Sequence, residues 1–209
     1  MSEEANSNAL GKGYFCDREP GRKGEILDAA LEVFGEYGYD GGSMRQIATK
    51  IGVTEPALYR HYAGKEAIFI ALMRAGACTV RDETFVLIDS LEPERVHEQL
   101  LEMLKDRRHS IRFFGPLLRI ILPAAANNER FRDEYLKLIV APTRERVTMK
   151  AVEIDEALGV RNAAASRDSR VRAFLALMVG YMVSSIVIGD EPDDAIVDAA
   201  VCIMRWDRG

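Results

Sequence analysis

The 209-residue chain lacks the features that mark secreted, disulfide-stabilised and membrane-spanning proteins. Its three cysteines, Cys16, Cys78 and Cys202, are odd in number and far apart, so we expect neither a disulfide framework nor a zinc site. The N-terminal residues are polar and acidic with no apolar stretch behind them, which predicts no secretory signal. The longest charge-free run, residues 173–189, has 17 residues and includes Gly180, so it suits a buried helix better than a membrane span. We therefore expect a cytoplasmic protein with no membrane contact.

Positive charge is also scarce. Lys and Arg total 28 against 33 Asp and Glu, which gives a formal net charge of -5 and a pI of about 5.4. Over the whole chain this balance argues against a nucleic-acid partner, because such binding needs a basic face. The average conceals two unlike regions, since residues 190–204 hold five acidic residues and no Lys or Arg, whereas residues 42–65 hold four basic residues against one acidic residue. The acidic total therefore does not exclude nucleic-acid binding by the N-terminal part.

Sequence motifs of the main enzyme classes are missing. We find no H-E-x-x-H, no dinucleotide-binding or phosphate-binding glycine pattern and no G-x-S-x-G. The three histidines, His61, His97 and His109, do not have the spacing of metal ligands. We therefore expect neither an enzyme nor a cofactor or metal site. A thiol-based redox sensor stays an alternative, because it needs only one reactive cysteine, as does a helical small-molecule-binding protein or enzyme that binds no DNA.

The apolar pattern predicts helices throughout. No segment alternates with period two over more than a few residues, so strands are not expected. Apolar residues from Ile26 to Tyr37 lie on one helical face, and the glycine cluster at residues 38–42 ends that helix. Beyond residue 65, breaks at Gly, Pro and Asn separate long periodic stretches. They predict helices near 65–90, 94–114, 116–126, 128–158, 166–188 and 193–206.

Residues 43–66 have the residue types that a helix-turn-helix needs at each position. Ser43 and Gln46 are a capping box that begins a short helix, and Gly52 supplies the unrestricted backbone of a tight turn. Thr54 can cap the second helix, and Leu58 anchors that helix to the core. Short helices joined by a glycine also occur in purely structural proteins. The agreement over about twenty residues favours a helix that enters a major groove of DNA.

Several short runs in this segment and before it carry a resemblance to a known family. They are Ala29-Ala30, Phe34, Tyr37-Gly38-Tyr39, Ile47-Ala48, Gly52-Val53-Thr54, Leu58 to Tyr62 and Lys65-Glu66-Ala67. With these runs the chain closely resembles the DNA-binding domain of the TetR family of bacterial transcriptional repressors. The specific match covers residues 22–75, about a quarter of the chain.

The resemblance implies an all-α protein in three parts. These are a flexible N-terminal arm at residues 1–20, a three-helix helix-turn-helix DNA-binding domain at 21–66, and a larger helical effector-binding and dimerisation domain at 67–209. It further implies a homodimer that binds a pseudo-palindromic operator in double-stranded DNA and represses transcription. A small molecule, expected to be largely apolar, would release it.

Carried over to this sequence, the resemblance also implies the DNA contacts. Arg45 is the side chain expected to reach a base, and guanine is its natural bidentate partner. Glu55 departs from the uncharged polar residues often found at its position, and either accepts from a cytosine amino group or complements the helix dipole. The implied DNA-binding residues are Ser43, Met44, Arg45, Thr54, Glu55, Pro56, Ala57, Tyr59, Arg60, His61 and Lys65.

The C-terminal helices predict a dimer interface and an effector site. Ala176, Gly180 and Ser184 are spaced four residues apart, which lets another helix approach closely, and Ala199 and Ile203 add to this surface from the last helix. Two such helices from each subunit would make a four-helix interface, while a contact within one chain is the alternative. The candidates for lining an effector cavity are mostly bulky apolar residues. They are Met103, Arg107, Phe113, Phe114, Tyr135, Met149 and Met178.

Overall fold

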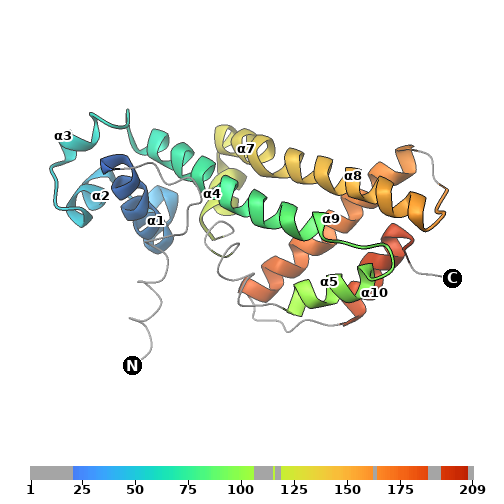
Figure 1. The fold of residues 1–209 in the computed structure, drawn as a ribbon. Helices are drawn as coiled ribbons and strands as arrows, with labels where there is room; N and C mark the ends of the chain where they lie inside the picture. The colour runs from blue at the N-terminus through green and yellow to red at the C-terminus, as the bar shows by residue number, and fades with distance from the viewer. Residues whose placement is uncertain (1–20, 106–114, 116–118, 162–163, 188–193, 207–209) are drawn as a thin grey trace, which may run out of the picture. The chain divides into compact units, whose positions relative to one another are not determined.

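The structure is a computed structural model that describes residues 21–105, 115, 119–161, 164–187 and 194–206. Over these residues it contains helices and no strand, which confirms the all-α prediction (Figure 1). The predicted N-terminal arm lies outside the described residues, as do three of the predicted effector-lining residues. Those three are Arg107, Phe113 and Phe114.

The described helices follow the predicted ranges closely. They are α1 (Arg22–Gly41), α2 (Met44–Lys50), α3 (Glu55–Leu58), α4 (Lys65–Asp89), α5 (Val96–Lys105), α7 (Glu129–Tyr135), the π-helical turn η1 (Leu136–Val140), α8 (Ala141–Ala157), α9 (Ala164–Val187) and α10 (Asp194–Met204). Residues 119–127 are also helical. The long helix predicted at 128–158 is therefore three elements. The π turn comes directly before Pro142, which has no N–H to direct to the carbonyl of residue 138.

The chain divides into two compact units. Residues 1–80 and 116–139 make up the first unit, and residues 81–115 and 140–209 make up the second. Helices α1 to α3, the first part of α4 and α7 thus belong together, whereas α5, α8, α9 and α10 belong to the other unit. The division into domains at residue 66 stays a prediction. The structure adds that α7, far along the chain, packs against α1 and α4 in the unit that contains the helix-turn-helix.

The first unit is built around a cluster of aromatic rings. Phe69 of α4 and Phe131 of α7 are fully buried with their centroids 4.6 Å apart. Phe34 of α1 lies 5.3 Å from Phe69, and Tyr39 lies 4.7 Å from both Phe69 and Phe131. Such edge-to-face pairs stabilise a core beyond the area that they bury. Helix α7 is therefore anchored to the same rings that hold α1 against α4.

The second unit contains a buried charge among apolar side chains. Asp155 of α8 has no exposed surface, and its carboxylate accepts from Arg167 Nε at 2.9 Å and from Arg170 at 2.7 Å. Trp206 Nε1, beyond α10, donates to the same carboxylate at 3.2 Å, and Arg170 also donates to the carbonyl of Met204. A buried charge is tolerated only when it is paired and hydrogen-bonded. This network ties α8, α9 and the end of α10 together.

Candidate nucleic-acid interface

Helix α2 begins with the predicted cap. The backbone N–H of Gln46 donates to Ser43 Oγ at 3.3 Å, and the Ser43 hydroxyl donates to Gln46 Oε1 at 2.6 Å. The capping-box prediction is confirmed, although the glutamine here accepts from the serine side chain. The hydroxyl proton that Ser43 would offer to a phosphate is directed to Gln46 in the free protein.

The turn between α2 and α3 has the geometry that its glycine predicts. Gly52 has a φ of 68°, a conformation that side chains with a Cβ rarely adopt. Its N–H donates to the carbonyl of Thr49 at 3.2 Å, and the N–H of Val53 donates to that of Ala48 at 3.0 Å. These two bonds satisfy carbonyls that the end of α2 would otherwise leave unpaired. The turn is thus fixed by the backbone.

The start of α3 differs from the prediction at Thr54. This residue occupies the N-cap position, but its side chain makes no capping bond. The reason is local: Pro56, second in the helix, has no N–H to offer, and the N–H of Ala57 donates to the backbone carbonyl of Thr54 at 3.0 Å. Leu58 is 1% exposed and anchors the helix as predicted. The Thr54 hydroxyl is left on the surface.

One face of the helix-turn-helix presents exposed side chains that pair with no other described side chain. Tyr59, 52% exposed, is one of the few large aromatic groups open to solvent. Among the residues that the structure describes, no side chain pairs with any of a set of five exposed polar or basic groups. That set, here called the recognition face, is Arg45, Thr54, Tyr59, Arg60 and His61. Of the other predicted contacts on α3, Pro56 is exposed while Glu55 and Ala57 are half-buried.

Two predicted DNA contacts need correction. Met44 is 6% exposed, because it faces the core beside Ile47 and Ala48, so its side chain does not reach DNA. The Lys65 ammonium donates to backbone carbonyls at the end of α1 and does not point into solvent. Lys50 pairs with Glu32 at 2.6 Å. Of the four basic residues counted in this segment, Arg45 and Arg60 have no partner among the residues that the structure describes.

The predicted effector-lining residues that the structure describes fall in both units. Met178 is a core residue of the second unit, Met103 packs against that core, and Tyr135 belongs to the first unit. Met149 is 57% exposed and so lies outside the core, and its role in lining a cavity stays a prediction. Its position explains the exposure: the buried stripe of α8 includes Val147, and a residue two positions later lies about 200° around the helix. Burial raises the pKa of the Tyr135 phenol.

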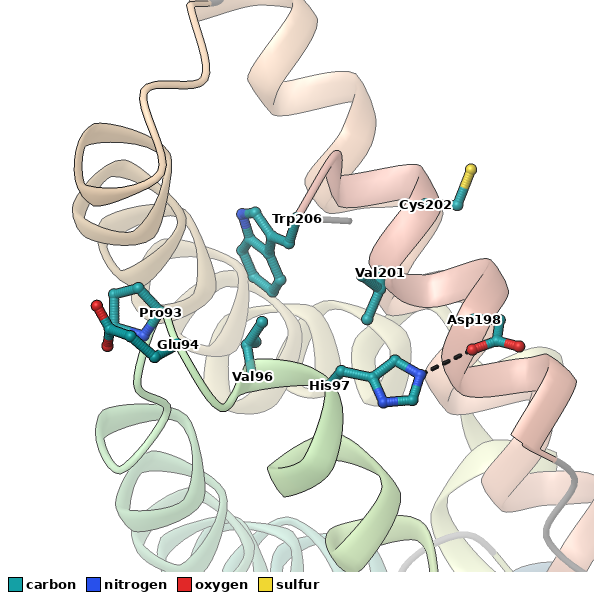
Figure 2. Close-up of a pocket in the computed structure, with 8 residues that line it drawn as sticks. All are labelled: Pro93, Glu94, Val96, His97, Asp198, Val201, Cys202 and Trp206. Atoms are coloured by element: carbon teal, nitrogen blue, oxygen red, sulfur yellow. Dashed lines mark hydrogen bonds and ion pairs between the residues drawn. The ribbon is translucent and has the colours of Figure 1, made fainter. Parts of the chain in front are cut away.

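A pocket of about 540 Å³ lies between α5 and α10 in the second unit (Figure 2). It has an apolar floor and a polar edge, where His97 Nε2 lies 2.7 Å from Asp198 Oδ1. Of the predicted effector residues that the structure describes, none lines it. His97 and Asp198 lie 101 positions apart in the sequence, so no short motif marks the pair. Its lining residues are Pro93, Glu94, Val96, His97, Asp198, Val201, Cys202 and Trp206.

The residues predicted for a dimer interface are open in the single chain. Ala176, Gly180 and Ala199 are exposed, and Ser184 and Ile203 are half-buried. A Cβ built on Gly180 would meet no atom within 4 Å, so that side of α9 is bare. Within the described ranges there is no group of three or more His, Cys, Asp or Glu residues suited to a metal ion. None of the described helices has the length and apolar character to cross a membrane.

Residues 26–72 match the model of a family described as bacterial regulatory proteins, tetR family. The transcriptional repressor Rv1474c of Mycobacterium tuberculosis is 40% identical over 58 residues, 28% of this chain and 31% of the repressor. The transcriptional activator FasR of Mycolicibacterium smegmatis is 40% identical over 53 residues, 25% of this chain and 24% of the activator. The chain thus spans less than a third of the length of either relative.

The fold is shared over a much larger part of the chain. A transcriptional regulator of Pseudomonas aeruginosa PAO1 superposes on it with a TM-score of 0.72, over 88% of each chain and at 17% identity. At this identity the likeness shows the fold alone. The sequence match is confined to the segment that contains the recognition face.

Proposed function

We propose, on the premise that the chain belongs to the tetR family of bacterial regulatory proteins, that it is a transcriptional repressor that binds operator DNA as a homodimer. The observation that carries the proposal is the recognition face. Arg45 and Arg60, which pair with no described residue, lie beside the turn at Gly52, together with hydroxyl and imidazole groups suited to phosphates and base edges. We assign no catalytic activity to the chain, and we expect it in the cytoplasm, where the chromosome is.

Repression is the simpler direction for this architecture. The matched segment occurs in both a repressor and an activator, so it does not decide between them. A repressor needs only to occupy its operator, whereas an activator needs a further surface that contacts the transcription machinery. We therefore propose repression, because the recognition face can occupy an operator without a further surface.

The bare strip on α9 supports the homodimer. Small exposed residues at Ala176 and Gly180 allow the axes of two helices to approach to the short end of the usual 8–10 Å. A symmetric pair places two recognition faces on one duplex, with half-sites about one helical turn apart. An inverted repeat is then the natural operator.

The pocket between α5 and α10 is our candidate effector site. Its floor of Val96, Val201 and Trp206 suits a largely apolar molecule, and the His97–Asp198 edge offers polar contacts. Trp206 is the one tryptophan of the chain, so its fluorescence reports on this pocket. An effector should quench or shift that emission and lower operator affinity in the same concentration range, because the two equilibria are linked. A compound that changes the emission without changing DNA binding would not be the effector.

Selection of DNA from a random library by the purified full chain tests the proposed function. We expect an enriched inverted repeat with half-site centres about 10 base pairs apart. The same selection with Arg45→Ala should lose preference at one position of each half-site. Arg95→Ala is the matched control, because Arg95 is also an exposed arginine and lies just before α5 in the other unit. No enrichment with the wild-type chain would contradict the proposal.

A further inference from the structure

Lys65, the first residue of α4, is held by the end of α1. Its Nζ donates to the carbonyl oxygens of Tyr39 at 2.8 Å, Gly42 at 3.0 Å and Asp40 at 3.4 Å. An ammonium group has three donors, and these bonds use all of them. The same Nζ lies 4.4 Å from the centroid of the Tyr39 ring, within the range of a cation–π contact. Lys65 therefore has no donor left for a phosphate.

The backbone of α1 explains why a cation sits there. The helix breaks at Gly38, whose φ of 69° and ψ of 176° are not helical. Carbonyls at a helix C-terminus lack partners inside the helix, and they carry the negative end of the helix dipole. A lysine from the next long helix satisfies them. The bonds join residues 23 to 26 positions apart.

The same short segment sets where the recognition face begins. Gly42 precedes Ser43, the N-cap of α2, and a Cβ on Gly42 would lie 2.7 Å from the Phe34 ring. The segment at residues 39–42 is thus pressed against the core on one side and bonded to Lys65 on the other. Arg45 follows within one turn. Its position on the surface depends on this segment.

Tyr39 connects this arrangement to α7. Burial raises the pKa of the Tyr39 phenol, and the charges of Glu66 and Asp40 raise it further, so the ring stays neutral beneath the ammonium. The ring also contacts the rings of Phe34, Phe69 and Phe131. A displacement of α7 would act directly on the ring that Lys65 covers.

We propose that Lys65 is a positioning residue that fixes the start of α2 and so orients Arg45 toward DNA, and that it makes no direct phosphate contact. The proposal rests on the DNA-binding function proposed above. It identifies Tyr39 as a ring that contacts both Lys65 and Phe131 of α7.

Two substitutions separate positioning from a phosphate contact. Lys65→Met removes the ammonium but keeps most of the stem, and Lys65→Arg keeps the charge in a planar fork that does not fit three converging carbonyls. We expect both variants to lose about tenfold in operator affinity. The slope of log affinity against log salt should stay as in the wild type, because no phosphate partner is lost. Arg60→Met is the matched control. If Arg60 contacts one phosphate, the magnitude of the slope of log affinity against log salt should fall by about 0.9 in this variant.

Hydrogen exchange of the DNA-free protein gives an independent readout. Amides at residues 39–46 should exchange faster in both Lys65 variants, while those of α8 in the other unit should not change. Wild-type affinity in Lys65→Arg together with a reduced salt slope in Lys65→Met would overturn the proposal, as would unchanged exchange at residues 39–46. Failure of the wild-type chain to bind any DNA would instead remove the proposed function, and the exchange result would still decide whether Lys65 holds the start of α2.

Discussion

The two compact units treat charge in opposite ways. In the first unit, Arg45 and Arg60 lie on the surface with no partner within the described ranges, where water solvates them at little cost. In the second unit, Asp155 has no exposed surface and is held by two arginines and an indole. An unpaired surface cation acquires an energetic role only when an external anion arrives, whereas a buried carboxylate depends on internal partners at all times. The first arrangement recognises a partner, and the second holds helices together.

The largest effect should follow from breaking the buried network. Asp155→Asn leaves Arg167 and Arg170 without their carboxylate, so we expect a loss of about 3–5 kcal/mol in the free energy of unfolding. Chemical denaturation measures it. Asp89→Asn is the control, because Asp89 pairs with Arg146 on the surface, and it should leave stability close to wild type. Equal losses in the two variants would mean that Asp155 is not the internal anchor described here.

The stability of the first unit should depend on its aromatic packing as strongly as the stability of the second unit depends on the buried Asp155 network. Phe131→Ala empties the aromatic cluster and should cost about 3–5 kcal/mol of unfolding free energy. Because Tyr39 loses a neighbour, exchange at residues 39–46 should also rise. Met149→Ala, at an exposed position, should change stability by less than about 0.5 kcal/mol. A small effect of Phe131→Ala would mean that α7 does not stabilise the unit that contains the helix-turn-helix.

Removing a surface cation should change binding and leave the fold intact. Arg45→Ala should weaken operator binding by about 1–3 kcal/mol, with the denaturation midpoint unchanged, because the side chain has no partner among the described residues. Arg95→Ala should alter neither quantity. Fluorescence anisotropy with labelled operator measures the affinity. A stability loss in Arg45→Ala would show that the residue has an internal role.

The smallest effect on the fold is expected at the bare strip of α9. Gly180→Leu places a side chain where a single chain has open space and replaces a poor helix former, so the monomer should be at least as stable. The dimer should weaken about tenfold or more, since the bulk prevents close helix approach. Sedimentation at several concentrations measures the dissociation constant. An unchanged dissociation constant would mean that the dimer interface does not include this side of α9.

Sequence patterns predicted best what depends on near neighbours. The Ser43–Gln46 cap, the positive φ of Gly52 and the burial of Leu58 all follow from residues within a few positions of one another. The uncapped hydroxyl of Thr54 also has a local cause, in the missing N–H of Pro56, and could have been predicted. Local backbone chemistry thus specifies the helix-turn-helix almost completely.

Pairings between distant residues left no pattern to recognise. Lys65 meets carbonyls 23 to 26 residues earlier, His97 meets Asp198, and Asp155 meets Trp206 51 residues later. Each was invisible in the sequence because it depends on how helices pack. The predicted effector residues had the same limit. They were chosen by residue type alone, and those that the structure describes belong to different units.

One measurement tests the central claim most directly: the affinity of the full wild-type chain for its selected inverted repeat and for a scrambled duplex of the same length, at one physiological salt concentration. If the recognition face reads an operator, the repeat should bind at least about a thousandfold more tightly than the scrambled duplex. Equal affinity for the two duplexes would contradict sequence-specific recognition and leave only the nonspecific attraction of a basic surface for phosphate.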